Sequence, residues 1–306
     1  MPKIAIVGCG AMGSVYAALL ASAGNHVVVA DTDDAHVQAI ASQGLRVTGA
    51  SGDRVVRIEA GRSLNQSADL IVLAVKGAFA EAAAQSVVPH LTENTLVLTI
   101  QNGLGSADKV ASVVGGDRLI VGVAEGFGAS LQAPGHAHHN AMKAIRMGAR
   151  AALDNDSVKW VVGLFSDAGF DALLADDIEA MQWEKLICNV AYSAPCALTG
   201  MTVGEVMDDP VVGQVSRDAA TEAWQIARAL GVAVSVTDPV QHVRDFAARM
   251  PDAKPSVLLD VQAGRFSEVG VINGAVPEQA AKVGLTAPVN ATLTALVKAL
   301  EQRQNK

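Results

Sequence analysis

The sequence predicts an α/β fold in which an N-terminal doubly wound, mostly parallel sheet is followed by an all-helical C-terminal domain. Short runs of Val, Ile and Leu alternate with helical segments through the first half of the chain, which is typical of a parallel sheet covered on both faces. After about residue 150 helical periodicity takes over. A length of 306 residues suits two domains, and we place them at residues 1–174 and 175–306.

The first elements can be read in order from the N-terminus. An apolar strand at residues 4–7 runs into a glycine-rich turn at 8–13 and then into an Ala- and Leu-rich helix at 14–23. A second strand at 26–30 and a second helix at 34–43 complete a βαβ-type beginning. The sheet is therefore expected to start at the first residues of the chain.

The later elements follow the same two periodicities. Further strands are predicted at residues 45–48, 55–58, 70–75, 95–99 and 119–123, with an Ala-rich helix at 78–87. Helices are predicted at residues 177–193, 209–230, 239–249, 256–267, 275–284 and 289–302. The second half is therefore expected to contain helices almost alone.

Composition excludes several classes of protein. Half of the residues are hydrophobic, 18% are charged and the net charge is −8, so the chain can bury a core and lacks the signature of disorder. An acidic surface repels phosphate backbones and aromatics make up only 4%, so no nucleic-acid partner is expected. The apolar runs are far shorter than the ~20 residues of a membrane helix. With no cleavable leader pattern, we expect a cytoplasmic protein without a membrane partner.

The glycine-rich turn predicts a dinucleotide-binding site. It matches G-x-G-x-x-G with Gly8, Cys9, Gly10, Ala11, Met12 and Gly13. Gly8 would permit the tight turn, Gly10 the approach of a pyrophosphate, and Gly13 the close packing of the helix. A strand before the motif and a helix after it indicate a Rossmann-type domain, and the helix N-terminus favours phosphate. A glycine turn of some other α/β protein is the alternative.

Asp31 predicts the choice of cofactor. It ends the second strand, 18 residues after Gly13, where a carboxylate accepts hydrogen bonds from the ribose hydroxyls and repels the 2′-phosphate of NADP. The residues that follow, 32–34, add negative charge and no arginine, so NAD is predicted. The alternative is a helix N-cap cluster, a role that suits Asp33 or Asp34 better than Asp31.

Two more polar residues follow predicted strands. Lys76 comes at the carboxyl end of one strand, where it would face the ligand crevice near the adenosine or simply be solvated. Asn102, in a Gln-Asn-Gly sequence, follows another. Its amide suits a nicotinamide ribose or a substrate oxygen, although Asn-Gly is also common in plain turns.

The helical half offers a candidate acid. Lys185 and Asn189 are four residues apart and share a helix face. The helix is otherwise apolar, and a partly desolvated lysine can act as a general acid near neutral pH. A plain surface charge is the alternative for Lys185. Ser256 and Glu268 are 12 residues apart, about 120° on an unbroken helix, so only a break near Gly264 or Gly270 would bring them together.

Metal, disulfide and serine-hydrolase chemistry are not expected. The local histidine cluster comprises His136, His138 and His139, and we interpret it as a hairpin with solvated histidines. The sequence lacks H-E-x-x-H and C-x-x-C, and its three cysteines are too far apart for a zinc site or a disulfide framework. It also lacks a G-x-S-x-G elbow.

Taken together, the motifs resemble the ketopantoate reductase (2-dehydropantoate 2-reductase) family. The matching pieces, in the family's order, are GCGAMGS at 8–14, VK at 75–76, QNG at 101–103, PGHAHH at 134–139, WEKLICN at 183–189 and SVLLDVQAGRFSEVGVING at 256–274. The glycine turn is shared with many dehydrogenases. The W-x-K-x-x-x-N and the S…E-x-x-x-x-N-G elements are much more specific to the family.

The resemblance implies roles for individual residues. It implies an active site in the cleft between the two domains, with Lys185 protonating a ketone oxygen as hydride arrives and Glu268 holding the substrate and orienting the acid. It also implies that Asn102, Asn189 and Ser256 bind the nicotinamide ribose, the substrate hydroxyl and the substrate carboxylate. Asn273 is a further candidate for the substrate pocket. By this resemblance, Ser256 and Glu268 meet at one site.

The sequence departs from the family at two places. The family carries a basic residue for the NADP phosphate near the end of the second strand, where this chain has Asp31. The family's E-[IV]-D is Glu268-Val269-Gly270 here. We therefore predict NAD where NADP is the family default, and the missing Asp leaves the substrate open.

The predicted function is reduction of a small 2-keto acid, 2-dehydropantoate or a similar one, to the 2-hydroxy acid with a nicotinamide cofactor. One alternative is an NAD-dependent D-2-hydroxyacid dehydrogenase acting on another branched or aromatic 2-keto acid. A second is a non-catalytic dinucleotide sensor. A third is a dehydrogenase of the 3-hydroxyacid or 6-phosphogluconate type, in which a cluster of arginines would be needed to bind a phosphate substrate. A homodimer is among the assemblies that the sequence allows.

Overall fold

The computed structural model describes residues 1–126, 128–141 and 144–304 and divides into two compact units. Unit 1 comprises Met1–Gln101 and Ser106–Ile178, and unit 2 comprises Asn102–Gly105 and Glu179–Lys306. The sequence places the division after residue 174. In the structure the chain passes from one unit to the other at residues 178–179, and the short loop 102–105 is counted with the helical unit.

Unit 1 is built on a large sheet of eight strands. Their order is β12 (Asp171–Leu174), β11 (Ala144–Ala149), β8 (Leu119–Glu125), β7 (Leu96–Thr99), β6 (Leu70–Leu73), β1 (Lys3–Val7), β2 (His26–Ala30) and β5 (Glu59–Gly61). Every neighbouring pair is parallel except β11 and β8, which are antiparallel. The predicted doubly wound, mostly parallel sheet is therefore confirmed.

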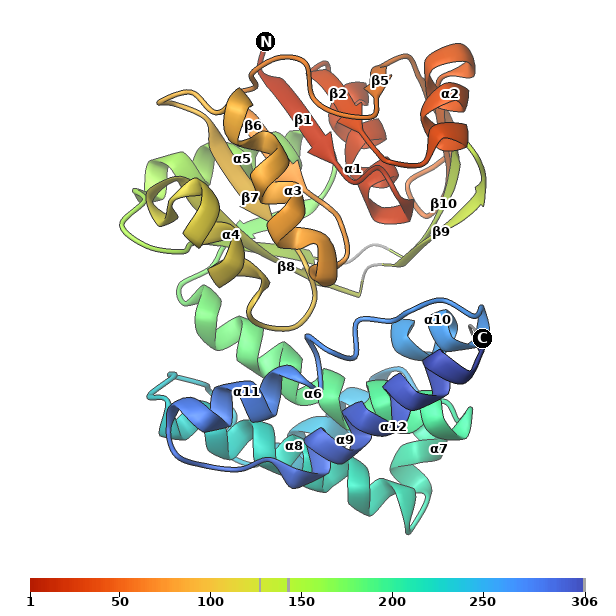
Figure 1. Cartoon of the computed structure of the whole chain (residues 1–306), viewed down its shortest axis with the longest axis vertical. Coiled ribbons are helices and arrows are strands. Elements are labelled where there is room, and N and C mark those ends of the chain that lie inside the picture. The colour runs from red at the N-terminus through yellow and green to blue at the C-terminus, as the bar shows by residue number, and fades with distance from the viewer. Residues whose placement is uncertain (127, 142–143, 305–306) are drawn as a thin grey trace. The chain divides into compact units, whose positions relative to one another are not determined.

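Helices cover both faces of this sheet because its strands are apolar on both sides. Ile4 and Ile6 of β1 belong to the core that includes α1 (Ala11–Ser22) and α5 (Asn155–Asp167). The intervening Ala5 and Val7 belong to the core that includes α3 (Ala80–Val87) and α4 (Ser106–Val114). Successive strand side chains point to opposite faces, which explains this alternation. In Figure 1, α3 and α4 lie on the face nearer the viewer.

A second, four-stranded sheet was not predicted. Its order is β4 (Arg54–Val56), β3 (Leu45–Gly49), β10 (His136–Ala141) and β9 (Gly128–Ala133), and it packs against α1. The predicted hairpin at the histidines is confirmed as β9 and β10. The prediction that the histidines are solvated is wrong for His139, which is fully buried, because β10 pairs with β3 as well as with β9.

Unit 2 is helical, as predicted. It contains α6 (Ile178–Thr199), α7 (Val203–Asp208), α8 (Val212–Ala229), α9 (Pro239–Arg249), α10 (Ser256–Gln262), α11 (Ala275–Lys282) and α12 (Pro288–Gln304). Three single turns of 3₁₀ helix, Gly77–Phe79, Val88–His90 and Gly116–Arg118, lie in unit 1. Helix α6 was expected to end at residue 193 but continues through Pro195 to Thr199. Its buried residues, such as Ile187 and Val190, form much of the unit's core.

The helix that begins at Ser256 is shorter than predicted. It was expected to run to residue 267 but ends at Gln262, and Gly264 follows with a φ of 66°. This is the left-handed region that favours glycine, so the helix cannot continue through it. Glu268 therefore lies on a separate turn, and the 120° offset of an unbroken helix does not apply.

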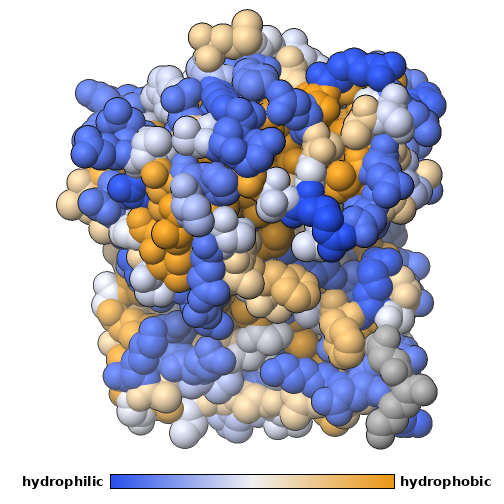
Figure 2. Space-filling model, turned by 45° about the horizontal axis from the view of Figure 1, so that its top comes forward, coloured by the Kyte–Doolittle hydropathy of each residue, from blue (hydrophilic) through white to orange (hydrophobic). Residues whose placement is uncertain are grey.

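No helix in the described ranges is long and apolar enough to cross a membrane. Large hydrophobic side chains such as Phe79, Val211 and Phe266 do reach the surface. On the face drawn in Figure 2, hydrophobic groups are interrupted by hydrophilic ones. Exposed apolar residues that are scattered in this way are normal for a folded protein.

Candidate active site

Three predicted site residues meet within unit 2. Lys185 of α6 donates from Nζ to Oδ1 of Asn102 at 2.8 Å. The amide nitrogen Nδ2 of Asn102 donates to Oε2 of Glu268 at 3.2 Å. Asn102 thus connects the ammonium group of one residue to the carboxylate of the other. All three side chains are half-buried, so they are still accessible to a small substrate.

The loop that carries Asn102 is held by the turn that carries Glu268. Leu104 N–H donates to Val271 O at 2.9 Å, and Gly103 has a φ of 79°. A Cβ at Gly103 would lie 1.9 Å from Val271 O, so only glycine fits this close approach. Val271 N–H in turn donates to Glu268 O at 3.0 Å. The backbone therefore holds the Asn102 loop against the turn of Glu268.

The chemistry of this cluster requires an amide at its centre. Asparagine offers an acceptor and a donor on one planar group, which is what a lysine on one side and a carboxylate on the other need. An ammonium next to a neutral acceptor keeps a proton available for transfer. The cluster is thus suited to general acid chemistry with a nearby carboxylate as its electrostatic partner.

The remaining predicted substrate residues are placed differently. Asn189 lies one turn after Lys185 on α6 and is half-buried. Ser256 begins α10 and is exposed, and no hydrogen bond joins it to Glu268 in the described part of the chain. Asn273 is fully buried and donates from Nδ2 to Val190 O and Asn290 Oδ1, both at 3.0 Å. Its amide nitrogen is therefore used within the fold.

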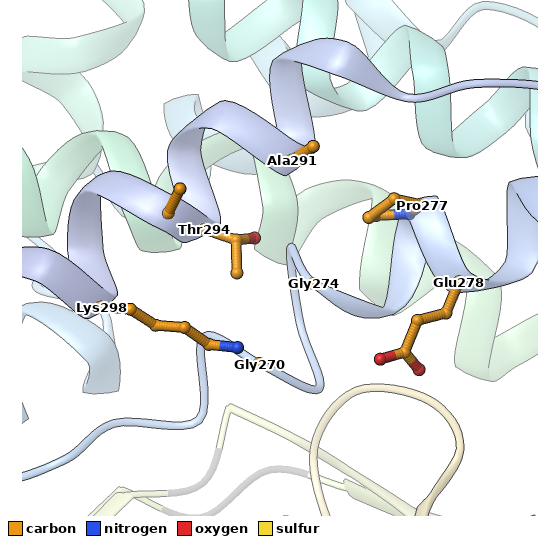
Figure 3. Close-up of a pocket in the computed structure, with 8 residues that line it drawn as sticks. Gly270, Gly274, Pro277, Glu278, Ala291, Thr294 and Lys298 are labelled. Carbon is orange, nitrogen blue, oxygen red and sulfur yellow. The ribbon is translucent and has the colours of Figure 1, made fainter.

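Gly270, which stands where the family's E-[IV]-D motif has Asp, lies at a hollow in unit 2. Gly270 lines a pocket of about 480 Å³ together with Gly274, Pro277, Glu278, Ala291, Thr294, Ala295 and Lys298. Figure 3 shows the Lys298 side chain extending toward Gly270. A Cβ at Gly270 would lie 3.8 Å from Lys298 Nζ, in ordinary contact. The carboxylate that the family places here would face this ammonium group.

The glycine turn of unit 1 has the shape of a phosphate cradle. Gly8 has a φ of 86°, and a Cβ there would lie 2.6 Å from Val75 Cγ1. A Cβ at Gly13 would lie 2.0 Å from Gly8 O. By contrast, a Cβ at Gly10 would meet nothing within 4 Å. The fold itself therefore requires glycine at the first and third positions, whereas at Gly10 the free space fits a ligand that must approach the backbone.

The aspartates that follow β2 have different roles. Asp33 is the N-cap of α2 (Asp34–Gln43) and accepts from His36 N–H at 3.1 Å, as expected for Asp33 or Asp34. Asp31 is half-buried, and its Oδ1 accepts from Asp33 N–H at 2.9 Å. This bond holds the Asp31 carboxylate at the carboxyl end of β2.

An arginine lies beside this acidic segment in three dimensions, although residues 32–34 contain none. Arg62 forms an ion pair with Asp34. It follows β5, which pairs with β2, and Asp31 N–H donates to Gly61 O at 3.0 Å. Strand β5 is only three residues long and carries no apolar run, so no sequence pattern could have placed Arg62 here.

Other candidate groups can be described briefly. Lys76 is half-buried and directly precedes the 3₁₀ turn Gly77–Phe79. Burial raises the pKa of the Cys9 thiol from its usual 9.0 to about 12, so this residue of the turn stays protonated at neutral pH. Among the described residues no three His, Cys, Asp or Glu side chains form a group that could hold a metal ion.

Comparison with known proteins decides the family. A model described as "Ketopantoate reductase PanE/ApbA" matches residues 4–152, and one described as "Ketopantoate reductase PanE/ApbA C terminal" matches residues 177–301. The chain belongs to the ketopantoate reductase family. The resemblance seen in the motifs is thereby confirmed, together with the enzyme class, a nicotinamide-dependent oxidoreductase that acts on 2-keto acids.

Three similar proteins cover nearly the whole chain. A 2-dehydropantoate 2-reductase from Halobacterium salinarum is 31% identical over 98% of this chain and 99% of its own. A ketopantoate reductase from Ralstonia eutropha has a TM-score of 0.90 at 31% identity, covering 99% of this chain and 100% of the other. D-mandelate dehydrogenase, solved with NADH and anilino(oxo)acetate, has a TM-score of 0.91 at 25% identity, with 99% of each chain covered.

Proposed function

We propose that the protein reduces a 2-keto acid to the 2-hydroxy acid with NADH and that Lys185 is the general acid. The observation that supports this proposal most is that hydrogen bonds link Lys185, Asn102 and Glu268 in a chain of this family. The nicotinamide supplies the hydride that adds to the ketone carbon. As the oxygen gains negative charge, the ammonium group of Lys185 gives it a proton, which balances the reaction.

The other residues of unit 2 hold the reactants. Asn102 orients the ammonium group of Lys185 through the 2.8 Å bond, and its place next to the acid also suits contact with the nicotinamide ribose. Glu268 stabilises the protonated lysine through Asn102 and holds the substrate. Asn189 binds the substrate hydroxyl and Ser256 donates to the substrate carboxylate. Asn273 is fully buried and supports α6 through its 3.0 Å bond to Val190 O, rather than contacting the substrate.

The glycine turn of unit 1 binds the pyrophosphate, with Gly10 at the closest approach and the N-terminus of α1 directed at the phosphates. Asp31 accepts from the ribose hydroxyls and disfavours a 2′-phosphate, which supports NAD. Arg62 is the nearby cation that would favour a 2′-phosphate, but its guanidinium is paired with Asp34. Lys76 contacts the adenosine portion.

A second candidate substrate class is supported by one comparison. D-mandelate dehydrogenase, an enzyme named for an aromatic 2-hydroxy acid and solved with NADH, covers 99% of this chain at 25% identity. Gly270, where the family has Asp, lines a hollow in unit 2. The similarity to D-mandelate dehydrogenase supports another branched or aromatic 2-keto acid as the alternative substrate.

Steady-state reduction of a panel of 2-keto acids, with NADH and NADPH in parallel, tests the proposal. The panel should contain 2-dehydropantoate, branched aliphatic 2-keto acids and phenylglyoxylate. We expect reduction with NADH, with one substrate class clearly preferred in kcat/KM. The absence of reduction with either cofactor across the panel would contradict the proposal and favour a dinucleotide sensor.

A further inference from the structure

A chain of buried hydrogen bonds within unit 1 leads from the β9–β10 turn to the glycine turn. Gly135 N–H donates to Nδ1 of His36 at 3.0 Å. Nε2 of His36 lies 3.3 Å from Oγ of Ser14, and Ser14 Oγ donates to Cys9 O at 2.8 Å. His36 is 2% exposed and Ser14 is fully buried. None of the predicted roles in cofactor or substrate binding uses either side chain.

The direction of every bond in this chain is fixed by its first member. A backbone N–H can only donate, so Nδ1 of His36 accepts and the neutral ring carries its proton on Nε2. Nε2–H therefore donates to Ser14 Oγ. The Ser14 hydroxyl then directs its own proton to the Cys9 carbonyl, which is the short bond of 2.8 Å. Buried polar groups that are satisfied in this way hold one conformation.

The bond to Cys9 O sets the orientation of the peptide that faces the ligand. No peptide bond among the described residues is cis, so the N–H of Gly10 points opposite to the C=O of Cys9 in the same plane. Cys9 O is turned inward to Ser14, and Gly10 N–H is therefore turned away from it. This N–H makes no hydrogen bond with the described residues, and a Cβ at Gly10 would meet nothing within 4 Å.

We propose that His36, acting through Ser14, is a positioning residue that orients the Gly10 N–H toward the pyrophosphate of the cofactor. The inference rests on the proposed function, because it needs a dinucleotide at the glycine turn. It also makes the β9–β10 turn part of the cofactor site, since Gly135 determines which nitrogen of His36 is protonated. Because the Gly10 N–H is already oriented, binding of the phosphate spends no free energy on ordering this donor.

The experiment measures the Kd of NADH by fluorescence titration and, separately, KM for the 2-keto acid. The variants are Ser14→Ala, His36→Leu and His36→Gln. Ser22→Ala is the matched control, because Ser22 lies on the same helix and also donates to a backbone carbonyl, Ala18 O at 2.8 Å.

We expect Ser14→Ala and His36→Leu to raise the Kd of NADH about 3- to 10-fold, the range for one lost hydrogen bond. KM for the keto acid should not change. His36→Gln should recover part of the affinity because its amide can both accept and donate. The double variant Ser14→Ala/His36→Leu should be no worse than the single ones, since both act through one chain. Ser22→Ala should bind NADH like the parent.

Folded variants that lose thermal stability but bind NADH as tightly as Ser22→Ala would overturn the inference, because the chain would then support the fold alone. Should His36→Leu not fold, Ser14→Ala decides the question by itself. A parent protein that binds neither NADH nor NADPH would overturn the proposed function and this inference together. A parent that binds NADH with unaffected variants would overturn only the inference.

Discussion

The ammonium group of Lys185 lies 2.8 Å from the side-chain oxygen of Asn102, a residue 83 positions earlier in the chain. The same amide donates to Glu268 Oε2, so an acid and a carboxylate are connected through a neutral group. If these residues were in direct contact, the carboxylate would hold the proton of the lysine more strongly. The intervening amide leaves the ammonium group oriented and still able to give its proton to a substrate.

The loop of Asn102 should be sensitive to a single methyl group. Gly103→Ala places a Cβ 1.9 Å from Val271 O and must displace Asn102 or the turn of Glu268. We expect kcat to fall about 10- to 100-fold in a protein that still folds, since misplacement by about 1 Å is that costly. Gly105→Ala is the matched control, with a φ of 86° but nothing within 4 Å of its Cβ. Equal losses in the two variants would show that backbone strain, not the contact with Val271, is responsible.

Ser256 and Glu268 should contribute to different kinetic parameters. Ser256→Ala should raise KM about 10-fold or more, the effect of one hydrogen bond to a charged acceptor, with a smaller loss of kcat. Glu268→Ala should damage both kcat and KM, because Asn102 and Lys185 lose their anionic partner. Kinetics of the double variant should show non-additive effects if both residues contact one substrate. Additive effects would place Ser256 outside the site.

Asp31 should determine the cofactor preference. Asp31→Asn removes the charge that repels a 2′-phosphate while keeping a hydrogen-bonding side chain, so the ratio of NADPH to NADH affinity should rise about 10-fold or more. Titration of each cofactor into the protein measures it. Arg62→Ala should be measured alongside it, because this variant removes the cation that lies beside Asp34. A parent that binds NADPH more tightly, with the preference lost in Arg62→Ala, would show that the arginine outweighs Asp31.

The three cysteines should be inert in the folded protein. Burial raises the thiol pKa of Cys9, Cys188 and Cys196 from 9.0 to about 12. At pH 8 a thiol reagent should modify none of them until the chain is unfolded. Above about pH 9 the thiols of the unfolded chain ionise while the folded ones stay protonated, so the free energy of unfolding should fall as the pH rises toward 12. Rapid modification of the native protein would contradict the burial of these groups.

The sequence predicted those features that depend on local pattern. The glycine turn, the strands around it and a lysine on an otherwise apolar helix are all visible within a few residues of one another. That Ser256 and Glu268 share one site is still a prediction from the family resemblance. It could not be derived from local pattern, because it depends on where α10 ends. The helix does break at Gly264, one of the two positions at which a break was considered.

Features that depend on long-range pairing were missed for a physical reason. Arg62 comes next to Asp34 only because the short β5 pairs with β2, and His36 meets Gly135 only because β10 joins β3 in a second sheet. Periodicity describes which face of an element is apolar but not which element it pairs with. The Asn102 amide likewise finds Glu268 through contacts across 166 positions.

The turnover number of Lys185→Ala at saturating NADH and 2-keto acid tests the central claim most directly. A general acid contributes about 10²- to 10⁴-fold, so kcat should fall by that factor while the Kd of NADH stays within about two-fold. Lys282→Ala, an exposed lysine in the last turn of α11, should retain the turnover of the parent. A Lys185→Ala enzyme that turns over within a few-fold of Lys282→Ala would contradict the assignment of Lys185 as the acid.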